Sequence, residues 1–201
     1  MGTVAMADLF DWYQENYQRY FARTRGVNPA SFLNPLVRHL KPGAVILDVG
    51  CGSGRDLKWL RERGFSVTGL ERAKGLAALA REHAGCIVIE GDFEVYDFSS
   101  VKADALLLSG SLVHVPHGSL ETVFNNIVRA LKPEGILLIS LKRGTGSAVD
   151  EEGRTFYYWE RSRLDPMFSQ AGFAILECRT SVSKVNPQDT WLSYLLRKSM
   201  N

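Results

Sequence analysis

One stretch of the sequence decides the fold: Val45-Ile46-Leu47-Asp48-Val49-Gly50-Cys51-Gly52-Ser53-Gly54-Arg55-Asp56. A short apolar, β-branched run ends in three alternating glycines, and a helix-forming segment then extends to Arg63. Glycine permits positive φ and lets a ligand approach the backbone with no Cβ in its way. Ligands of open parallel sheets lie at the carboxyl ends of the strands. The stretch therefore predicts a strand, a ligand-binding turn at Gly50, Cys51 and Gly52, and a helix.

Outward from this turn, strand-like and helix-like segments alternate, which is typical of βαβ units and a parallel sheet. The predicted strands are Val45–Val49, Ser66–Leu70, Cys86–Ile89, Ala103–Ser109, Ile136–Leu141, Phe173–Thr180 and Trp191–Arg197. The predicted helices are Ser31–Leu40, Arg55–Arg63, Ala73–His83, Ser119–Leu131 and Arg161–Ala171. Only a polar turn separates the last two strands, so they should pair antiparallel and finish the sheet with a reversed edge element.

Composition narrows the class of protein. The chain has 201 residues, 45% of them apolar and 23% charged, which is typical of one globular domain. We divide that domain into an N-terminal helical cap (1–43), a cofactor-binding core (44–141) and a lid loop with a helix and antiparallel edge strands (142–201). The net charge of +2 is too slight to indicate nucleic acid.

The cysteines and the apolar runs exclude two further classes. Three widely spaced cysteines fit neither a disulfide framework nor a zinc site, so no metal is expected. Runs such as Ile136–Ile139 are far shorter than the roughly 18 residues of a membrane span. We therefore expect a cytoplasmic protein, monomeric or homodimeric, with no membrane partner.

Acidic residues around the turn indicate the ligand. A nicotinamide dinucleotide fingerprint needs its third glycine one position later than Gly54. Asp48, just before the first glycine, would repel a pyrophosphate but suits an ammonium group. Glu71, 23 residues after Asp48, ends the second strand and can accept hydrogen bonds from both ribose hydroxyls. Asp92 can accept from the adenine amine, with Phe93 beside the base. This pattern favours S-adenosylmethionine.

Several segments together resemble the class I S-adenosylmethionine-dependent methyltransferases, and in particular a group of small bacterial members of largely unassigned substrate. They are Ile46–Asp56, Val67–Glu71, Gly91–Phe93, Leu106–Pro116 and Leu131–Leu137, so the likeness covers most of the chain. The resemblance implies a Rossmann-like, doubly wound α/β fold with helices on both faces. Its seven-stranded sheet has the order 3-2-1-4-5-7-6, with strand 7 antiparallel. It also implies backbone around Gly50 and Ser109 on the methionine portion of the cofactor.

The chemistry that the resemblance implies is an in-line displacement, for which positioning and desolvation can supply most of the catalysis. A base is needed only where the acceptor must lose a proton. His114, after the fourth strand, is the best candidate; the alternative is a structural histidine bonded to backbone. Asn/Asp-Pro-Pro-Tyr is absent from Ser109–Pro116, which argues against amino-directed nucleobase methylation.

Two flanking segments should enclose the acceptor. Tyr13 and Tyr20 supply aromatic walls, and Arg25 a cation for the cofactor carboxylate; the tyrosines are equally consistent with a hydrophobic seam that covers the sheet. Arg143 and Arg154, with Lys142, could hold an anionic acceptor near Tyr157. The alternative for these cations is a solvated flap, since Lys142–Arg154 reads as a mobile, glycine-rich loop.

The leading hypothesis is a methyltransferase that acts on a small-molecule acceptor. A tRNA-modifying methyltransferase is the second, although it would require a basic face. A non-catalytic, S-adenosylmethionine-binding regulatory protein is the third, because cofactor motifs alone do not decide turnover. An oxidoreductase is the weakest.

Overall fold

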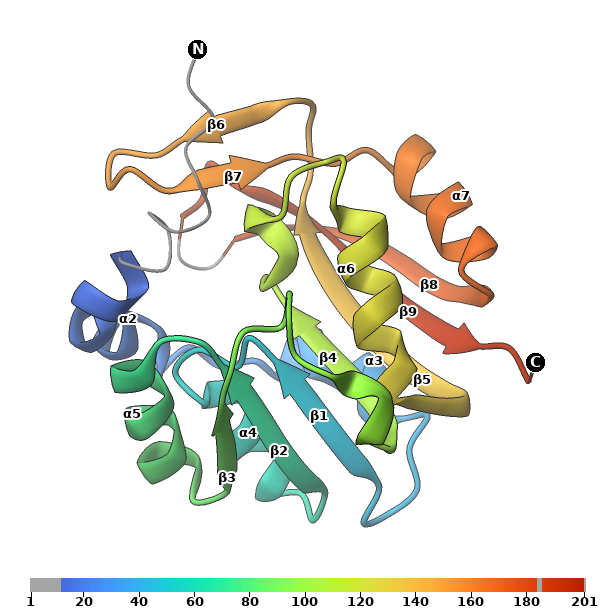
Figure 1. Cartoon of the computed structure of the whole chain (residues 1–201), viewed down its shortest axis with the longest axis horizontal. Coiled ribbons are helices and arrows are strands. Elements are labelled where there is room, and N and C mark those ends of the chain that lie inside the picture. Colours follow the sequence, from blue (N-terminus) through green and yellow to red (C-terminus); the bar gives the residue numbers. More distant parts are fainter. Residues whose placement is uncertain (1–11, 184–185, 201) are drawn as a thin grey trace.

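The computed structural model describes residues 12–183 and 186–200, and its main element is a seven-stranded sheet with the order β3-β2-β1-β4-β5-β9-β8 (Figure 1). The strands are β1 (Val45–Val49), β2 (Ser66–Glu71), β3 (Ile87–Glu90), β4 (Ala103–Ser109), β5 (Leu131–Lys142), β8 (Phe173–Val182) and β9 (Thr190–Lys198). Counted within this sheet, the order is the predicted 3-2-1-4-5-7-6.

The reversed strand is also confirmed, at the place of strand 7 in the predicted order. β9 pairs antiparallel with β5, from Ile136–Arg197 to Lys142–Trp191, and antiparallel with β8 on its other side. The reversed strand thus lies one position inside the sheet, and β8 forms the edge.

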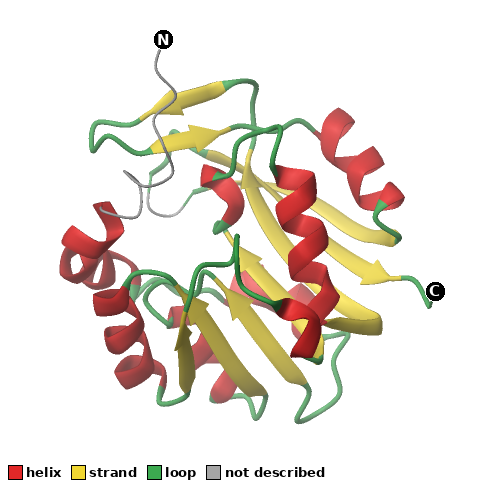
Figure 2. Cartoon of the chain, in the orientation of Figure 1, coloured by secondary structure: helices red, strands yellow, loops and turns green. Residues whose placement is uncertain are grey.

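Helices cover both faces of the sheet, as expected (Figure 2). On one face lie α3 (Ala30–Val37), α4 (Arg55–Arg61) and α5 (Lys74–Ala84); on the other lie α6 (Leu120–Ile127) and α7 (Arg161–Gln170). Each face has its own core: Leu36 and Leu57 belong to the first, Phe124 and Phe168 to the second. Because parallel strands are buried on both sides, β1 and β4 are almost continuously apolar.

The fifth strand starts earlier than predicted. The predicted helix Ser119–Leu131 ends at Ile127 and continues as a 3₁₀ turn over Val128–Ala130. Lys132–Gly135, predicted as a turn before the strand, instead forms an irregularity within β5: Leu131 pairs with Ala103, and Ile136 with Ala105. Glu134 has φ 61°, which accommodates the extra residues.

The segment predicted as a loop, Lys142–Arg154, is partly a hairpin. β6 (Ser147–Val149) pairs antiparallel with β7 (Thr155–Tyr157), and this hairpin lies beyond the carboxyl ends of the main strands (Figure 1). The residues of β6 are exposed, so the strand carries no apolar alternation by which the sequence could reveal it.

The N-terminal cap contains α2 (Tyr17–Thr24), which contacts α5; residues 1–11 of the predicted cap lie outside the described residues. No helix in the described part of the chain has the length and apolar character needed to cross a membrane. The cytoplasmic location therefore stays a prediction.

Candidate cofactor and acceptor site

The glycine turn after β1 has the backbone conformation that its sequence requires. Gly50, Gly52 and Gly54 have φ of 73°, 56° and 71°, in the left-handed region that favours glycine. The amides of Gly50 and Cys51 donate to the carbonyl of Leu70, at 2.8 and 3.0 Å, and so bind the turn to the end of β2. These two hydrogen bonds therefore fix the position of the turn relative to β2.

Glu71 connects the glycine turn to the start of α5. Its carboxylate is 8% exposed; Oε2 accepts the Gly52 amide at 3.0 Å, and Oε1 accepts the Ala73 amide at 2.9 Å. Burial raises the pKa of this carboxyl, and the backbone donors oppose that rise. Each oxygen keeps a further lone pair for a ligand hydroxyl.

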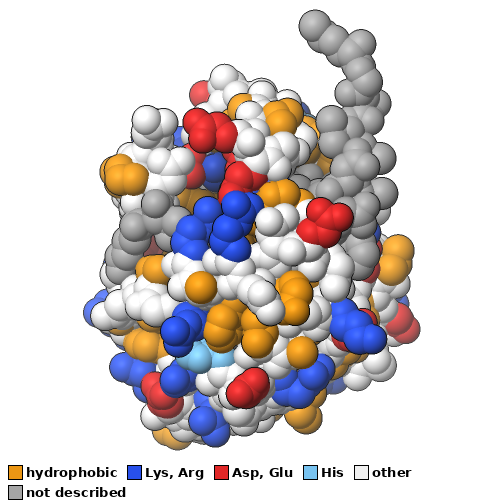
Figure 3. Space-filling model, turned by 90° about the vertical axis from the view of Figure 1, so that its left-hand side faces the viewer, with side chains coloured by type: hydrophobic (Ala, Val, Ile, Leu, Met, Phe, Trp, Pro, Cys, Tyr) orange, Lys and Arg blue, Asp and Glu red, His pale blue; other side chains and the backbone are white. Residues whose placement is uncertain are grey.

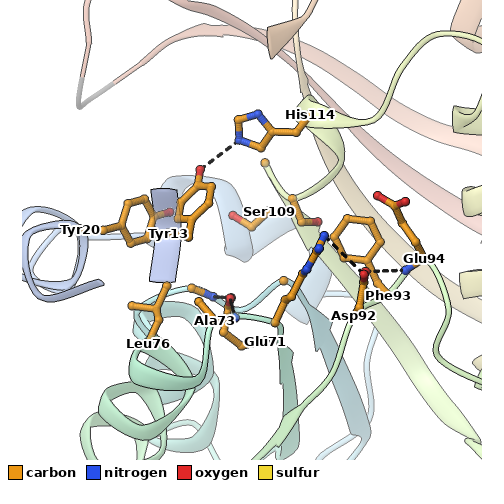
Figure 4. Close-up of a pocket in the computed structure, with 15 residues that line it drawn as sticks. Tyr13, Tyr20, Glu71, Ala73, Leu76, Asp92, Phe93, Glu94, Ser109 and His114 are labelled. Carbon is orange, nitrogen blue, oxygen red and sulfur yellow. Dashed lines mark hydrogen bonds and ion pairs between the residues drawn. The ribbon is translucent and has the colours of Figure 1, made fainter. Parts of the chain in front are cut away.

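Asp92 follows β3 and lies across the pocket from Glu71 (Figure 4). Its Oδ1 accepts the Glu94 amide at 3.0 Å, and its Oδ2 lies 3.4 Å from Nη1 of Arg72. Phe93 lines the same end of the pocket and packs on the core. The Asp92 carboxylate, a hydrogen-bond acceptor, and the Phe93 ring thus lie together at the end of the pocket where the sequence predicts adenine.

These residues line one open-mouthed pocket, which has about 720 Å³ of empty space when the solvent at its mouth is included. Most of the predicted site residues lie in it: Tyr13, Tyr20, Gly50, Gly52, Glu71, Asp92, Phe93, Ser109 and His114. Elements far apart in the sequence therefore converge on one pocket.

Three predicted cofactor residues do not line the pocket. Asp48 and Cys51 are buried beside the turn, and the Cys51 thiol packs so closely on Gly69 that a Cβ there would be 2.7 Å from its sulfur. Arg25 is exposed, with its guanidinium 5.6 Å from the ring centroid of Phe21. The expectation that Arg25 holds the cofactor carboxylate thus has no support from its position at the end of α2.

Asp48 is a buried carboxyl whose two oxygens find no hydrogen-bond partner in the described part of the chain. Burial raises its pKa well above the usual range; the carboxylates of Asp56 and Glu71 add to this rise, and the Arg55 guanidinium opposes it.

We expect Asp48→Asn to flatten the dependence of stability on pH. A carboxyl whose pKa is higher in the folded than in the unfolded state contributes most stability at low pH. This contribution falls, by up to about 1.4 kcal/mol per pH unit, as the pH rises from about 4 through the folded pKa. Urea unfolding between pH 4 and 8 should show a smaller fall in the free energy of unfolding for the variant. Parallel curves would contradict the raised pKa.

The aromatic residues of the N-terminal cap cover the turn. Tyr20 lies over Gly52, where a Cβ would come within 3.3 Å of its ring, and the Tyr13 and Tyr20 rings pack edge to face with centroids 5.2 Å apart. Both tyrosines line the pocket, so they form part of its wall in addition to packing on each other and on the turn.

His114 is held between two segments. Its Nδ1 lies 2.6 Å from the carbonyl oxygen of Thr155 in the hairpin, and its Nε2 lies 3.0 Å from the hydroxyl of Tyr13 (Figure 4). A carbonyl only accepts, so Nδ1 carries the proton; Nε2 then accepts from the Tyr13 hydroxyl. Burial lowers the pKa of His114 to about 4, so the ring is neutral at pH 7.

The residues predicted to hold an anionic acceptor do not line the pocket. Nη2 of Arg154 lies 2.6 Å from Asp150 and 2.9 Å from Glu152, and its guanidinium stacks 4.2 Å from the Trp12 ring centroid. Arg143 is exposed. Tyr157 packs against His117, with ring centroids 5.3 Å apart.

Comparison with known proteins agrees with this geometry. Residues 46–135 match the family model described as a methyltransferase domain, and the solved structures that resemble the chain include several S-adenosylmethionine-dependent methyltransferases. These comparisons support a class I S-adenosylmethionine-dependent methyltransferase domain over residues 46–135, and the solved structures show that the chain has the class I fold. The matched residues include the glycine turn, Glu71, Asp92 and His114.

Individual relatives of this methyltransferase domain differ in length and substrate. The sterol 24-C-methyltransferase of Gibberella zeae is 34% identical over 143 residues, which are 63% of this chain and 37% of that protein. An uncharacterised methyltransferase of Geobacillus is 24% identical over 84% of this chain and 86% of its own. The Burkholderia thailandensis 1,6-didemethyltoxoflavin-N1-methyltransferase, solved with S-adenosylhomocysteine, has a TM-score of 0.76 and 22% identity over 99% of this chain and 92% of its own. The chain thus spans little more than a third of the sterol enzyme.

The pocket of the methyltransferase domain fits the family's cofactor. A Cβ at Gly50 would lie 2.5 Å from Cβ of Ser111, so only glycine leaves room at the turn. The buried, ionisable Glu71 carboxylate faces the same space and suits hydroxyl donors rather than phosphates.

Sequence reasoning missed some lining residues of the methyltransferase domain: Arg72, Ala73, Leu76, Glu94, Gly110 and Ser111. Most of these residues are close in sequence to Glu71, Phe93 or Ser109. This proximity was the one feature of the sequence that could have indicated them. Leu76 lies in the first turn of α5 and could be found only by placing that helix over the pocket.

Proposed function

We propose that this chain binds S-adenosylmethionine and transfers its methyl group to a small-molecule acceptor by in-line displacement. The observation that carries the proposal is the buried Glu71 carboxylate, hydrogen-bonded to the glycine turn and facing the pocket. We further propose that residues 1–201 act as one domain, with the cap and the hairpin closing the core.

Each end of the pocket has a role in this proposal. Glu71 accepts hydrogen bonds from the ribose hydroxyls, Asp92 accepts from the adenine amine, and Phe93 packs on the base. Backbone at Gly50 and Ser109 holds the methionine portion. S-adenosylmethionine supplies a methyl group on positively charged sulfur: as the acceptor's lone pair bonds to carbon, the carbon–sulfur bond breaks and its electrons stay on sulfur.

His114 is the proton acceptor in this proposal. His114 lines the pocket, and the Thr155 carbonyl fixes the tautomer that leaves Nε2 unprotonated. Because the ring is neutral, it does not repel the positively charged sulfur of the cofactor.

Charge pairing favours a small acceptor over tRNA. On the face that contains α2, basic side chains are interspersed with acidic and apolar ones rather than forming a uniform basic surface (Figure 3). Arg19 and Arg23 of α2 lie 2.9 and 3.9 Å from Glu152 of the hairpin. Phosphate binding would have to compete with these ion pairs.

Calorimetry and label transfer test the function together. We expect S-adenosylhomocysteine to bind with a Kd of about 1 μM, which corresponds to about −8 kcal/mol. We also expect label from [methyl-³H]S-adenosylmethionine to enter small molecules of a bacterial cell extract. Absence of binding would contradict the cofactor site, while binding without label transfer would favour the non-catalytic regulatory protein.

We expect His114→Asn to lower the rate of methyl transfer about a hundredfold, because general-base catalysis is lost. The Kd for S-adenosylhomocysteine should stay within threefold (roughly 0.7 kcal/mol). His117→Asn is the matched control: His117 also bonds a backbone carbonyl, that of Tyr158 just after β7, at 2.9 Å, but it does not line the pocket. Equal rates for both variants would exclude His114 as the base.

A further inference from the structure

The acceptor end of the pocket offers neutral polar groups. His114, Tyr13 and Ser111 meet there, and the buried hydroxyl oxygen of Ser111 has no hydrogen-bond partner among the described residues. Arg72 is the one Lys or Arg among the described lining residues, and it lies against Asp92 at the adenine end.

The cations nearest His114 are already paired. Arg154 contacts two carboxylates, and Nζ of Lys142, whose side chain is 8% exposed, lies 2.9 Å from Oδ2 of Asp189 and 3.7 Å from the Phe156 ring centroid. A carboxylate or phosphate acceptor would lose its hydration without gaining a cationic side chain of the protein, unless it broke one of these buried ion pairs. The site therefore disfavours an anionic acceptor.

The unprotonated nitrogen of His114, Nε2, selects for an acceptor molecule that donates a hydrogen bond. Nδ1–H is committed to the Thr155 carbonyl, and Nε2 accepts the Tyr13 hydroxyl at 3.0 Å. Burial raises the pKa of that phenol, so it remains a neutral donor. An acceptor hydroxyl or N–H can take the place of the Tyr13 hydroxyl at Nε2, whereas the lone pairs of an anion would face another lone pair.

The low pKa of His114 further restricts the class of acceptor molecule. Burial lowers the pKa of His114 to about 4; Arg154 and Lys142 lower it too, while the Thr155 carbonyl and Asp150 oppose the shift. An aliphatic amine, with a pKa near that of lysine at about 10, arrives protonated and cannot pass its proton to such a base. An oxygen or heteroaromatic nitrogen that is gaining a methyl group becomes acidic enough to do so.

We propose that the acceptor is a neutral molecule that presents a hydroxyl group or a heteroaromatic N–H, and that it is neither a carboxylate nor an aliphatic amine. This inference rests on the proposed function of the same site. The acceptor atom's lone pair forms the bond to the methyl carbon, the carbon–sulfur bond breaks with its electrons on sulfur, and the acceptor proton moves to Nε2 of His114. Nδ1–H stays on the Thr155 carbonyl.

The chemical class of the labelled product tests this inference. A macromolecule-free extract of bacterial cells is incubated with the protein and [methyl-³H]S-adenosylmethionine, and products are sorted by cation exchange and by treatment with mild base. Ethers and N-methyl heteroaromatics that are neutral at the pH of the column pass through it and survive base. Methylated aliphatic amines bind the column, and methyl esters release labelled methanol in base.

We expect most of the His114-dependent label in the neutral, base-stable fraction, and at least a tenfold loss of that label with His114→Asn but not with His117→Asn. His114-dependent label mainly in the ester or amine fraction would overturn the acceptor class while leaving the methyltransferase function intact. No labelled product at all, from protein that binds S-adenosylhomocysteine, would contradict the proposed transfer and the acceptor inference with it.

Discussion

Glu71→Gln should weaken the binding of S-adenosylhomocysteine about a thousandfold, from micromolar to millimolar Kd, which corresponds to about 4 kcal/mol. Two charge-assisted hydrogen bonds to the ribose hydroxyls, worth about 2 kcal/mol each, would be lost or weakened. Both oxygens of Glu71 also accept backbone amides, from Gly52 and Ala73. The amide nitrogen of glutamine would oppose one of these donors and disturb the glycine turn. Calorimetric titration measures the effect.

Glu90→Gln is the matched control for this variant. Glu90 lies directly opposite Glu71 in the pairing of β2 with β3, but it is exposed and does not line the pocket. We expect its Kd to stay within twofold of the wild type (roughly 0.4 kcal/mol). If the Glu71 variant binds S-adenosylhomocysteine as tightly as the Glu90 variant, Glu71 does not contact the ribose.

Gly50→Ala should abolish measurable binding and lower the free energy of unfolding by about 2–5 kcal/mol. The positive φ of 73° costs an L-residue about 1–2 kcal/mol. The new methyl group would also lie 2.5 Å from Cβ of Ser111, so the turn must move away from the end of β4, at an overpacking cost of about 1–3 kcal/mol. Urea unfolding and calorimetry measure the two effects.

Gly43→Ala separates backbone strain from the clash. Gly43 has nearly the same φ, 74°, but a Cβ there would meet nothing within 4 Å. This variant should lose only the roughly 1–2 kcal/mol of strain and should bind S-adenosylhomocysteine normally. Equal destabilisation by the two substitutions would show that the contact with Ser111 does not matter.

The cofactor end of the pocket could be predicted because its information is local. Gly50, Gly52 and Glu71 each stand at the end of a strand whose apolar pattern is clear, and parallel strands bring those ends together. The strand order came instead from the resemblance to a family, since alternation alone does not rank strands across a sheet. That order is confirmed.

The acceptor end could not be predicted, because it depends on contacts between distant segments. Tyr13 and His114 are 101 positions apart, and no local pattern indicates that Thr155 fixes the histidine tautomer. Arg154 pairs with two acidic residues of its own hairpin, and this could not be predicted because the sequence indicated a loop there. Arg154 and Lys142, which were predicted to bind an anionic acceptor, are therefore paired with carboxylates of the protein.

A crystal structure of the protein with S-adenosylhomocysteine tests the central claim most directly. The account predicts both ribose hydroxyls within hydrogen-bond distance of Glu71, the adenine amine on Asp92 with the base against Phe93, and sulfur open toward His114. Ligand bound elsewhere, or ribose hydroxyls turned away from Glu71 toward solvent, would contradict it.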